Sequence, residues 1–400
     1  KNNNIFVVGD MAQAIYSWRG ADYKNIINFK KDYPKASVYT LTQNYRSTKT
    51  IIDASKSVIK NNINNINLDL WTTNDDGEKI KIFEAQNEKE EAEYIANKIL
   101  DSGFELNEIG VLYRTNAQSR NLEEYLLKYN IPYKIFGGLK FYDRKEVKDI
   151  ISYLKVINNP KDEIAWMRII NTPPRGIGKQ NLQKIKDNNF DIDFIEKYNI
   201  GIKGLIDNKN SLNTTEIIEN IIKITKYTEY LKGQNEEEEK IQERIENIKE
   251  LKSVAKEFPD LLDFLQNTSL LEDSGTKNSE YSSSRVSLMT LHSAKGLEFN
   301  LVFLAGLEEG IFPHSRSLEN KEELEEERRL YYVGITRAKT SLHISYAKKR
   351  MFFGNINFSN PSRFLFEIPA NLTETNLNPY KKITQKEIEQ LDDFFENLGI

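Results

Sequence analysis

The sequence contains no cysteine, only three histidines among 400 residues, and no apolar run long enough to cross a bilayer. The absence of cysteine excludes disulfides, thiolate metal sites and cysteine nucleophiles. Because histidines are so few, we expect no metal ligands in this chain. The start, Lys1 to Asn4, has neither an initiating Met nor a hydrophobic signal region, which indicates a fragment of a cytoplasmic protein.

The chain also lacks a marked excess of either charge. Lys and Arg number 56 against 60 Asp and Glu, so the net charge is −4. A strongly basic balance, which would indicate nucleic acid as a partner, is absent. A motor that grips and releases a nucleic-acid strand nevertheless needs only a local basic groove. Composition by itself favours an ordinary acidic protein, and the length predicts two or three domains.

Apolar runs and amphipathic stretches predict an α/β fold. The first strands are expected at 5–8, 37–41, 79–84 and 109–113, and the first helices at 23–33, 49–61, 88–102 and 118–129. Further helices are expected at 148–157, 164–170, 182–186, 215–232 and 236–257, followed by a polar linker at 269–284. Strands return at 286–290, 301–305 and 342–346, and a last helix is expected at 385–398. This order indicates a mostly parallel sheet interrupted by a helical insertion.

Two arginines lie in unusual polar segments, Arg46 in Gln43–Thr48 and Arg337 at the end of Tyr332–Arg337. Phosphoryl transfer spreads negative charge over the oxygens of a terminal phosphate. The planar, permanently charged guanidinium suits that charge better than an ammonium group does. A single arginine is more often a surface ion-pair partner. Two of them, in their full motifs, favour a phosphate site.

A third polar segment follows the apolar run that ends at Asp10. The amide of Gln13 could bind a phosphate oxygen and an attacking water, or it could simply cap a loop. Tyr16 and Trp18 could stack on nucleic-acid bases, and Arg19 could pair with a backbone phosphate. The alternative for these three is a small hydrophobic cluster under a cation.

The segment Thr290–Phe299 predicts a turn after a buried strand. Glu298 could hydrogen-bond a ribose hydroxyl, and His292 could face a nucleic-acid strand, although a histidine in a turn is usually an ordinary satisfied polar residue. A second turn, inside the helical region, could present backbone amides to phosphate or could simply join two helices. Its residues are Arg175, Gly176 and Gly178.

Taken in order, these segments resemble motifs III to VI of the UvrD/Rep/PcrA-like superfamily 1 DNA helicases, over Ile5 to about Pro369. The resemblance implies an ATP-driven motor that moves 3′ to 5′ on single-stranded DNA and unwinds duplex. It also implies RecA-like domains of the P-loop NTPase type. The implied parts are 1–40 (end of the first RecA-like domain), 41–138 and 284–370 (second RecA-like domain), 139–283 (helical insertion) and 371–400 (loosely held tail).

The resemblance assigns roles to single residues. Gln13 would couple the γ-phosphate to DNA, Tyr45 would stack near adenine, and Glu298 would approach the ribose. Arg46 and Arg337 would hold the γ-phosphate. The residues expected to contact DNA are Tyr16, Trp18, Arg19, Arg114, Asn116, His292, His314 and Phe353, together with Arg175, Gly176 and Gly178 of the insertion.

The sequence departs from the family pattern in two places. Met11 and Ala12 stand where the family has a further acidic residue before the glutamine, while the spacing of Gln13, Tyr16 and Arg19 is kept. The chain also contains no Gly-x-x-x-x-Gly-Lys-Ser/Thr phosphate loop and no Asp-Glu-x-x-Asp segment. In the family these supply the phosphate-binding lysine, the Mg²⁺ ligands and the catalytic glutamate.

We therefore expect ATP and Mg²⁺ as cofactors, with the Mg²⁺ ligands outside this chain. The expected partners are single-stranded DNA and single-strand/duplex junctions, with no membrane. By itself the chain is expected to bind ATP poorly and to hydrolyse none. Two alternatives stay open at this point: a non-catalytic DNA-binding or partner-binding remnant, and a subunit of a helicase–nuclease machine.

Overall fold

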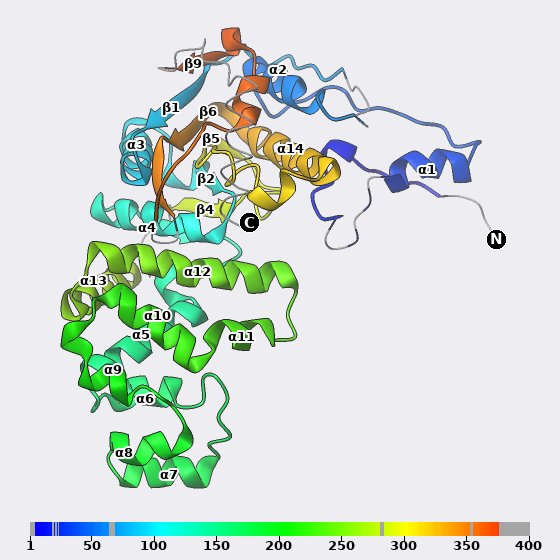
Figure 1. The fold of residues 1–400 in the computed structure, drawn as a ribbon. Helices are drawn as coiled ribbons and strands as arrows, with labels where there is room; N and C mark the ends of the chain where they lie inside the picture. Colours follow the sequence, from blue (N-terminus) through cyan, green and yellow to red (C-terminus); the bar gives the residue numbers. More distant parts are fainter. Residues whose placement is uncertain are drawn as a thin grey trace.

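The computed structural model describes residues 5–17, 20, 22, 24–63, 69–280, 284–352 and 355–375, and for 272–280, 352 and 355 the backbone alone. Figure 1 shows an α/β part built around a sheet and, beside it, a part made of helices. Within these described ranges, each helix is too short or too polar to cross a bilayer.

In the described residues, a seven-stranded sheet has the order β3-β4-β2-β5-β6-β1-β9, and its pairings are parallel. The strands are β1 (Ile80–Ala85), β2 (Ile109–Tyr113), β3 (Tyr133–Ile135), β4 (Val286–Thr290), β5 (Phe299–Leu304), β6 (Ala338–Ala347) and β9 (Thr373–Thr375). A parallel sheet joined by helices confirms the α/β class and is consistent with a RecA-like domain.

Helices cover both faces of the sheet (Figure 1). Successive side chains of a strand point to opposite faces, so Val111 and Leu112 of β2 enter different cores. The core at Val111 lies under α3 (Glu88–Asp101) and α4 (Ser119–Lys128). The core at Leu112 lies under α2 (Lys49–Ile59) and α14 (Lys321–Ile335). Because both faces are covered, every residue of β2 is buried.

Local sequence determines where several of these helices begin. The side chain of Asn87 accepts hydrogen bonds from the backbone N–H groups of Lys89 and Glu90, both at 3.0 Å, at the start of α3. Asn320 accepts in the same way from Glu322 at the start of α14. Acidic residues in the first turn of both helices interact favourably with the positive end of the helix dipole.

The helical part is inserted between β3 and β4, which are neighbours at one edge of the sheet. It has its own hydrophobic core, in which Trp166 and Phe264 are completely buried. Its helices are α5 (Lys145–Asn158), α6 (Glu163–Ile169), α7 (Lys179–Asp187), α8 (Ile192–Ile195), α9 (Lys203–Asp207), α10 (Thr214–Thr225), α11 (Tyr227–Lys232), α12 (Glu238–Glu257) and α13 (Leu261–Glu280).

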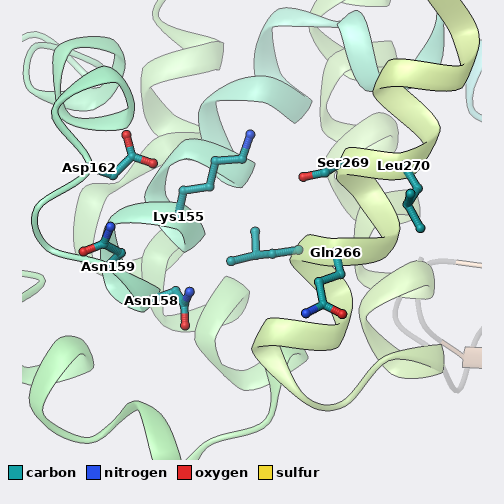
Figure 2. A pocket seen from close by; sticks show the side chains of 8 residues that line it. Lys155, Asn158, Asn159, Asp162, Gln266, Ser269 and Leu270 are labelled. Carbon is teal, nitrogen blue, oxygen red and sulfur yellow. The ribbon is translucent and has the colours of Figure 1, made fainter.

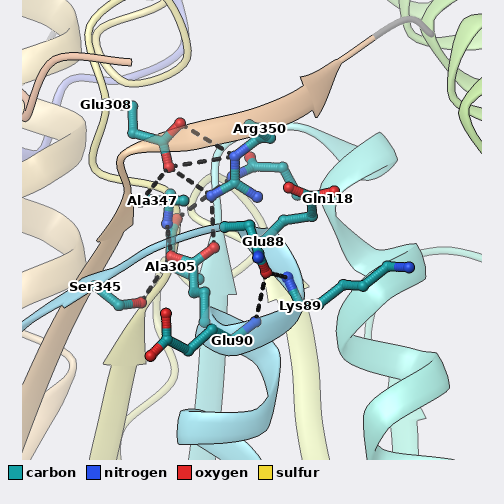
Figure 3. A network of polar contacts seen from close by, with 12 residues as sticks. Glu88, Lys89, Glu90, Gln118, Ala305, Glu308, Ser345, Ala347 and Arg350 are labelled. Atoms are coloured by element: carbon teal, nitrogen blue, oxygen red, sulfur yellow. Dashed lines mark hydrogen bonds and ion pairs between the residues drawn. The ribbon is translucent and has the colours of Figure 1, made fainter. Parts of the chain in front are cut away.

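After β6 the chain forms a hairpin of β7 (Lys349–Phe352) and β8 (Asn355–Phe358). A buried ion network holds its base (Figure 3). The Arg350 guanidinium lies 2.5 Å from carboxylate oxygens of both Glu308 and Glu91. Glu91 also accepts from the backbone N–H of Gly306 and the hydroxyl of Ser345, each at 2.8 Å. These bonds join the hairpin to α3 and to the loop after β5.

Several predicted elements are wrong. Residues 5–8 and 37–41 form no strand, and Phe6 and Tyr39 are 88% and 85% exposed. An apolar run becomes a strand only where another strand pairs with it, and these runs have no such neighbour among the described residues. The linker expected at 269–284 is helical as far as Glu280, the end of α13. The helix expected at 215–232 is broken at Lys226, whose φ is 51°. The helix expected at 385–398 lies outside the described residues.

A short helix, α1 (Lys24–Asp32), completes the described elements near the N-terminus (Figure 1). None of its residues is buried. It follows the turn at Met11–Gln13, which packs beside α14. That turn brings the first polar segment of the sequence to the sheet.

Candidate functional site

Three charged residues from distant segments meet at the amino ends of β5 and β6. Glu298 directly precedes β5, and Arg337 directly precedes β6. Arg46 reaches this edge from the loop before α2, where its guanidinium donates to the carbonyl oxygen of Thr336 at 3.0 Å. The Arg337 guanidinium donates to the hydroxyl of the same Thr336 at 3.1 Å. The two predicted phosphate-binding arginines are therefore close together.

Local hydrogen bonds shape the loop that carries Arg46. The side chain of Asn44 accepts from the backbone N–H groups of Arg46 and Ser47, at 2.9 and 3.0 Å. Such a turn, closed by an asparagine, is a common alternative to regular structure. Beside it, the ring of Tyr45 is 76% exposed and its hydroxyl donates to Gln43 at 2.7 Å. The predicted adenine-stacking ring thus has an open face.

Arg337 is a buried cation, only 2% exposed. Its guanidinium donates to the carbonyl oxygens of Val333 and Leu297, at 2.9 and 3.0 Å, as well as to Thr336. Within the described residues it forms no ion pair with a carboxylate. Burial, and next the positive charge of Arg46, lower the pKa of Arg337 to about 10. A buried charge without a counter-ion is costly, so this position favours an anion.

Glu298 lies between two cations. Its carboxylate is 2.6 Å from Arg46 and 2.7 Å from Lys339. The hydrogen bond from Lys339, and next that from Arg46, lower the pKa of Glu298. Lys339 was not among the residues expected from sequence. Its position two residues after Arg337 is a weak signal in the sequence, because that position alone does not place Lys339 beside Glu298.

Gln13 lies in the turn that follows Asp10. Its side-chain amide donates to the Asp10 carboxylate at 2.6 Å, and its backbone carbonyl oxygen accepts from Lys295 at 2.7 Å. Lys295 precedes Glu298 by three residues, so this contact joins the turn to the segment that carries Glu298. Gln13 is thus brought towards the same edge of the sheet, and Lys295 holds it there.

Tyr16 and His292 lie next to each other. The Tyr16 hydroxyl donates to the His292 carbonyl oxygen at 2.9 Å, and the ring centroids are 6.2 Å apart. Lys295 lies 5.2 Å from the centroid of the Tyr16 ring. Ile15, completely buried, anchors this segment in the core. Three further predicted DNA contacts lie outside the described residues: Trp18, Arg19 and Phe353.

Arg114, Asn116 and His314 lie where the sheet meets α12 of the insertion. Arg114 forms a two-pronged ion pair with Glu327, at distances down to 2.7 Å. Asn116 donates to Glu243 of α12 at 3.1 Å. The His314 ring lies 3.8 Å from another α12 carboxylate. Each of the three side chains therefore already contacts a carboxylate, which a DNA phosphate would have to displace.

In the turn of the insertion, Arg175 binds its own loop. Its guanidinium donates to the carbonyl oxygen of Ile169 at 2.9 Å and to the hydroxyl of Tyr153 at 2.7 Å. These bonds give Arg175 a role in closing the turn. Gly176, with φ 69°, and Gly178 are exposed, so the backbone of the turn is accessible from outside. The predicted phosphate contact stays a prediction for this backbone.

An open pocket of about 590 Å³ lies elsewhere, in the insertion between α5 and α13. Figure 2 shows Lys155, Asn159 and Asp162 on one side of it, with Gln266, Ser269 and Leu270 on the other. None of the residues predicted to bind ATP or DNA lines this pocket. Its mixed polar lining suggests no particular chemistry.

Comparison with known proteins identifies the family. The description "UvrD-like helicase C-terminal domain" matches residues 39–349, and "UvrD/REP helicase N-terminal domain" matches residues 1–34. A protein from Bacillus subtilis (strain 168), "ATP-dependent DNA helicase PcrA", is 46% identical over 95% of this chain and 56% of its own length.

Two staphylococcal proteins with the same name are similar. The one from Staphylococcus epidermidis (strain ATCC 12228 / FDA PCI 1200) is 43% identical over 94% of this chain. The one from Staphylococcus aureus (strain NCTC 8325 / PS 47) is 43% identical over 96% of it. The chain spans 56% and 57% of these two relatives. With most of its length matched in this way, the chain belongs to the UvrD-like helicase family.

Proposed function

We propose that this chain is the C-terminal part of an ATP-dependent DNA helicase in which Arg46 and Arg337 contact the γ-phosphate. The observation that carries the proposal is the contact of both guanidiniums with Thr336. Two cations this close repel each other, and a multiply charged anion between them would stabilise both. The terminal phosphate of a nucleotide is such an anion.

The neighbouring residues suit the remaining parts of a nucleotide. The exposed ring of Tyr45 is proposed to stack on adenine, and Glu298 to accept a hydrogen bond from the ribose. Gln13 is proposed to bind a phosphate oxygen or the attacking water. Arg337 is already oriented by backbone carbonyls, so it would meet the charge that develops during phosphoryl transfer without rearranging.

The chain supplies only part of such a site. Its sequence has no phosphate loop. Among the described residues, no group of three or more His, Asp or Glu side chains is placed to hold a metal ion. The residues present therefore do not fit a Mg²⁺ site. Catalysis requires a second domain that presents the triphosphate.

For the DNA side, we propose a path along the segment of Tyr16 and His292, beside Lys295. Aromatic rings stack on bases of any sequence, and a lysine nearby neutralises phosphate charge. We also propose movement from 3′ to 5′ and binding at single-strand/duplex junctions, and both proposals rest on the family resemblance. The alternative, a non-catalytic remnant that binds DNA or a protein partner, is supported by the missing phosphate loop alone.

The test is Arg337→Ala in a complete protein that joins this chain to an N-terminal nucleotide-binding half. We expect DNA-stimulated ATP hydrolysis to fall by about 1000-fold or more, the typical effect of losing such an arginine. Nucleotide affinity, measured with a non-hydrolysable ATP analogue, should fall much less.

The control is Arg363→Ala, which removes a guanidinium that pairs with Glu309, a residue after the carboxyl end of β5. This variant should keep its turnover. Unchanged hydrolysis in Arg337→Ala would refute the assigned role of Arg337.

A further inference from the structure

One carboxylate at the proposed nucleotide site is shared by two cations from different segments. Oε2 of Glu298 accepts from Nε of Arg46 at 2.6 Å, and Oε1 lies 2.7 Å from Nζ of Lys339. Each carboxylate oxygen therefore has its own cation. Arg46 comes from the loop before α2, and Lys339 from the start of β6.

All three side chains are partly exposed, with 30% for Arg46, 42% for Glu298 and 36% for Lys339. Ion pairs of this kind are weak in water. A side chain in such a pair can therefore change partner at little cost. Arg46 would leave Glu298 readily for a terminal phosphate, which carries more negative charge than a carboxylate.

We propose that Lys339 is a positioning residue that acts through Glu298. While Arg46 is bound to Glu298, Lys339 takes part of the carboxylate charge and so weakens the hold of Glu298 on Arg46. When Arg46 moves to the γ-phosphate, Lys339 keeps Glu298 in place. Oε2 of the carboxylate is then open to accept a hydrogen bond from the ribose.

This inference rests on the proposed nucleotide site and adds a coupling to it. The departure of Arg46 needs a γ-phosphate, so it occurs with a triphosphate and not with a diphosphate. The hydrogen bond that Glu298 accepts from the ribose would therefore strengthen when the γ-phosphate is present. Loss of Lys339 should weaken triphosphate binding more than diphosphate binding, because Arg46 would then be held more tightly.

The experiment compares Lys339→Met, Glu298→Gln and the double variant in the complete protein, by equilibrium titration with a non-hydrolysable ATP analogue and with ADP. We expect Lys339→Met to lower the affinity for the ATP analogue about threefold, which is the effect of losing one exposed ion pair. The affinity for ADP should stay unchanged. Lys339→Arg should restore the affinity. In the Glu298→Gln background, Lys339→Met should have no further effect, because the residue through which it acts is already altered.

The matched control is Lys348→Met. Lys348 pairs with Glu84 at 2.5 Å, just after the other end of the same strand, β6. This variant should bind both nucleotides as the parent does. Urea unfolding of the 400-residue chain checks that each variant is folded.

Two results would overturn the inference: an equal loss for ADP and the ATP analogue, or a loss that persists in the Glu298→Gln background, which would mean that Lys339 touches the nucleotide itself. The proposed function is tested separately by Arg337→Ala. If Arg337→Ala abolishes turnover while Lys339→Met still lowers affinity in the Glu298→Gln background, only the role of Lys339 is refuted.

Discussion

At the scale of single residues, the same chemical group has different roles according to the partners that surround it. Arg337 and Arg114 are both shielded from water, but Arg114 has the Glu327 carboxylate and Arg337 has only neutral oxygens among the described residues. An arginine paired with a carboxylate is satisfied, whereas Arg337 would gain from an incoming anion. The sequence marked both as candidates, and only their surroundings distinguish them.

His343 makes a residue-scale prediction about pH. Its ring is buried and its Nδ1 lies 2.9 Å from the Tyr94 hydroxyl. Burial, and next the charges of Lys81 and Lys98, lower the pKa of His343 to about 4. An unfolded histidine titrates near about 6.5, so between these values the unfolded chain binds the proton and the folded chain does not. The stability from His343 is complete above the unfolded value and is lost as the pH falls towards 4.

We therefore expect His343 to account for about 2 kcal/mol of the stability lost between roughly pH 7 and pH 5. Over the same pH interval, the free energy of unfolding of the His343→Gln variant should fall by that much less than that of the parent chain. Urea unfolding of both proteins at the two pH values measures the difference. Equal losses would show that His343 does not remain neutral in the folded chain.

At the scale of elements, two neighbouring glutamates illustrate how burial determines the effect of losing an ion pair on stability. Glu308 is completely buried and binds Arg350 at the base of the β7–β8 hairpin. Glu309, the next residue, binds Arg363, whose side chain is 44% exposed. Both pairs are two-pronged. The two pairs differ in their exposure to water, since the first is buried and the second is partly exposed.

Arg350→Met should cost about 3–5 kcal/mol of unfolding free energy, because it leaves the Glu308 and Glu91 carboxylates buried without their cation. Arg363→Met should cost about 1 kcal/mol or less, as exposed pairs do. Urea unfolding of the two variants compares them directly. Similar costs for both would contradict the structural role of the buried network.

At the scale of the whole molecule, the chain spans little more than half of the relatives that it matches. Phe6, Val8, Tyr39 and Leu41 are exposed in the structure, although their apolar runs resemble buried strands. We attribute these failed strand predictions to the absence of pairing strands from the described residues, because a strand is completed by its neighbours.

The 400-residue chain alone should hydrolyse no ATP above background, with or without single-stranded DNA. The physical reason is that it contributes arginines for a terminal phosphate but no phosphate loop to present one. A phosphate-release assay on the purified chain is the measurement. Robust DNA-stimulated hydrolysis would mean that this chain holds a complete site.

The sequence by itself determined the α/β class and the helical insertion, because hydrophobic period is a local property of the chain. Its motif order predicted a shared site for Arg46 and Arg337. Only the tertiary structure decided the partners of charged side chains. Asn116 and His314 face acidic residues of α12, and Glu298 meets Lys339, through contacts between segments far apart in the sequence. Burial and ion pairing depend on neighbours in space, so no reading along the chain could assign them.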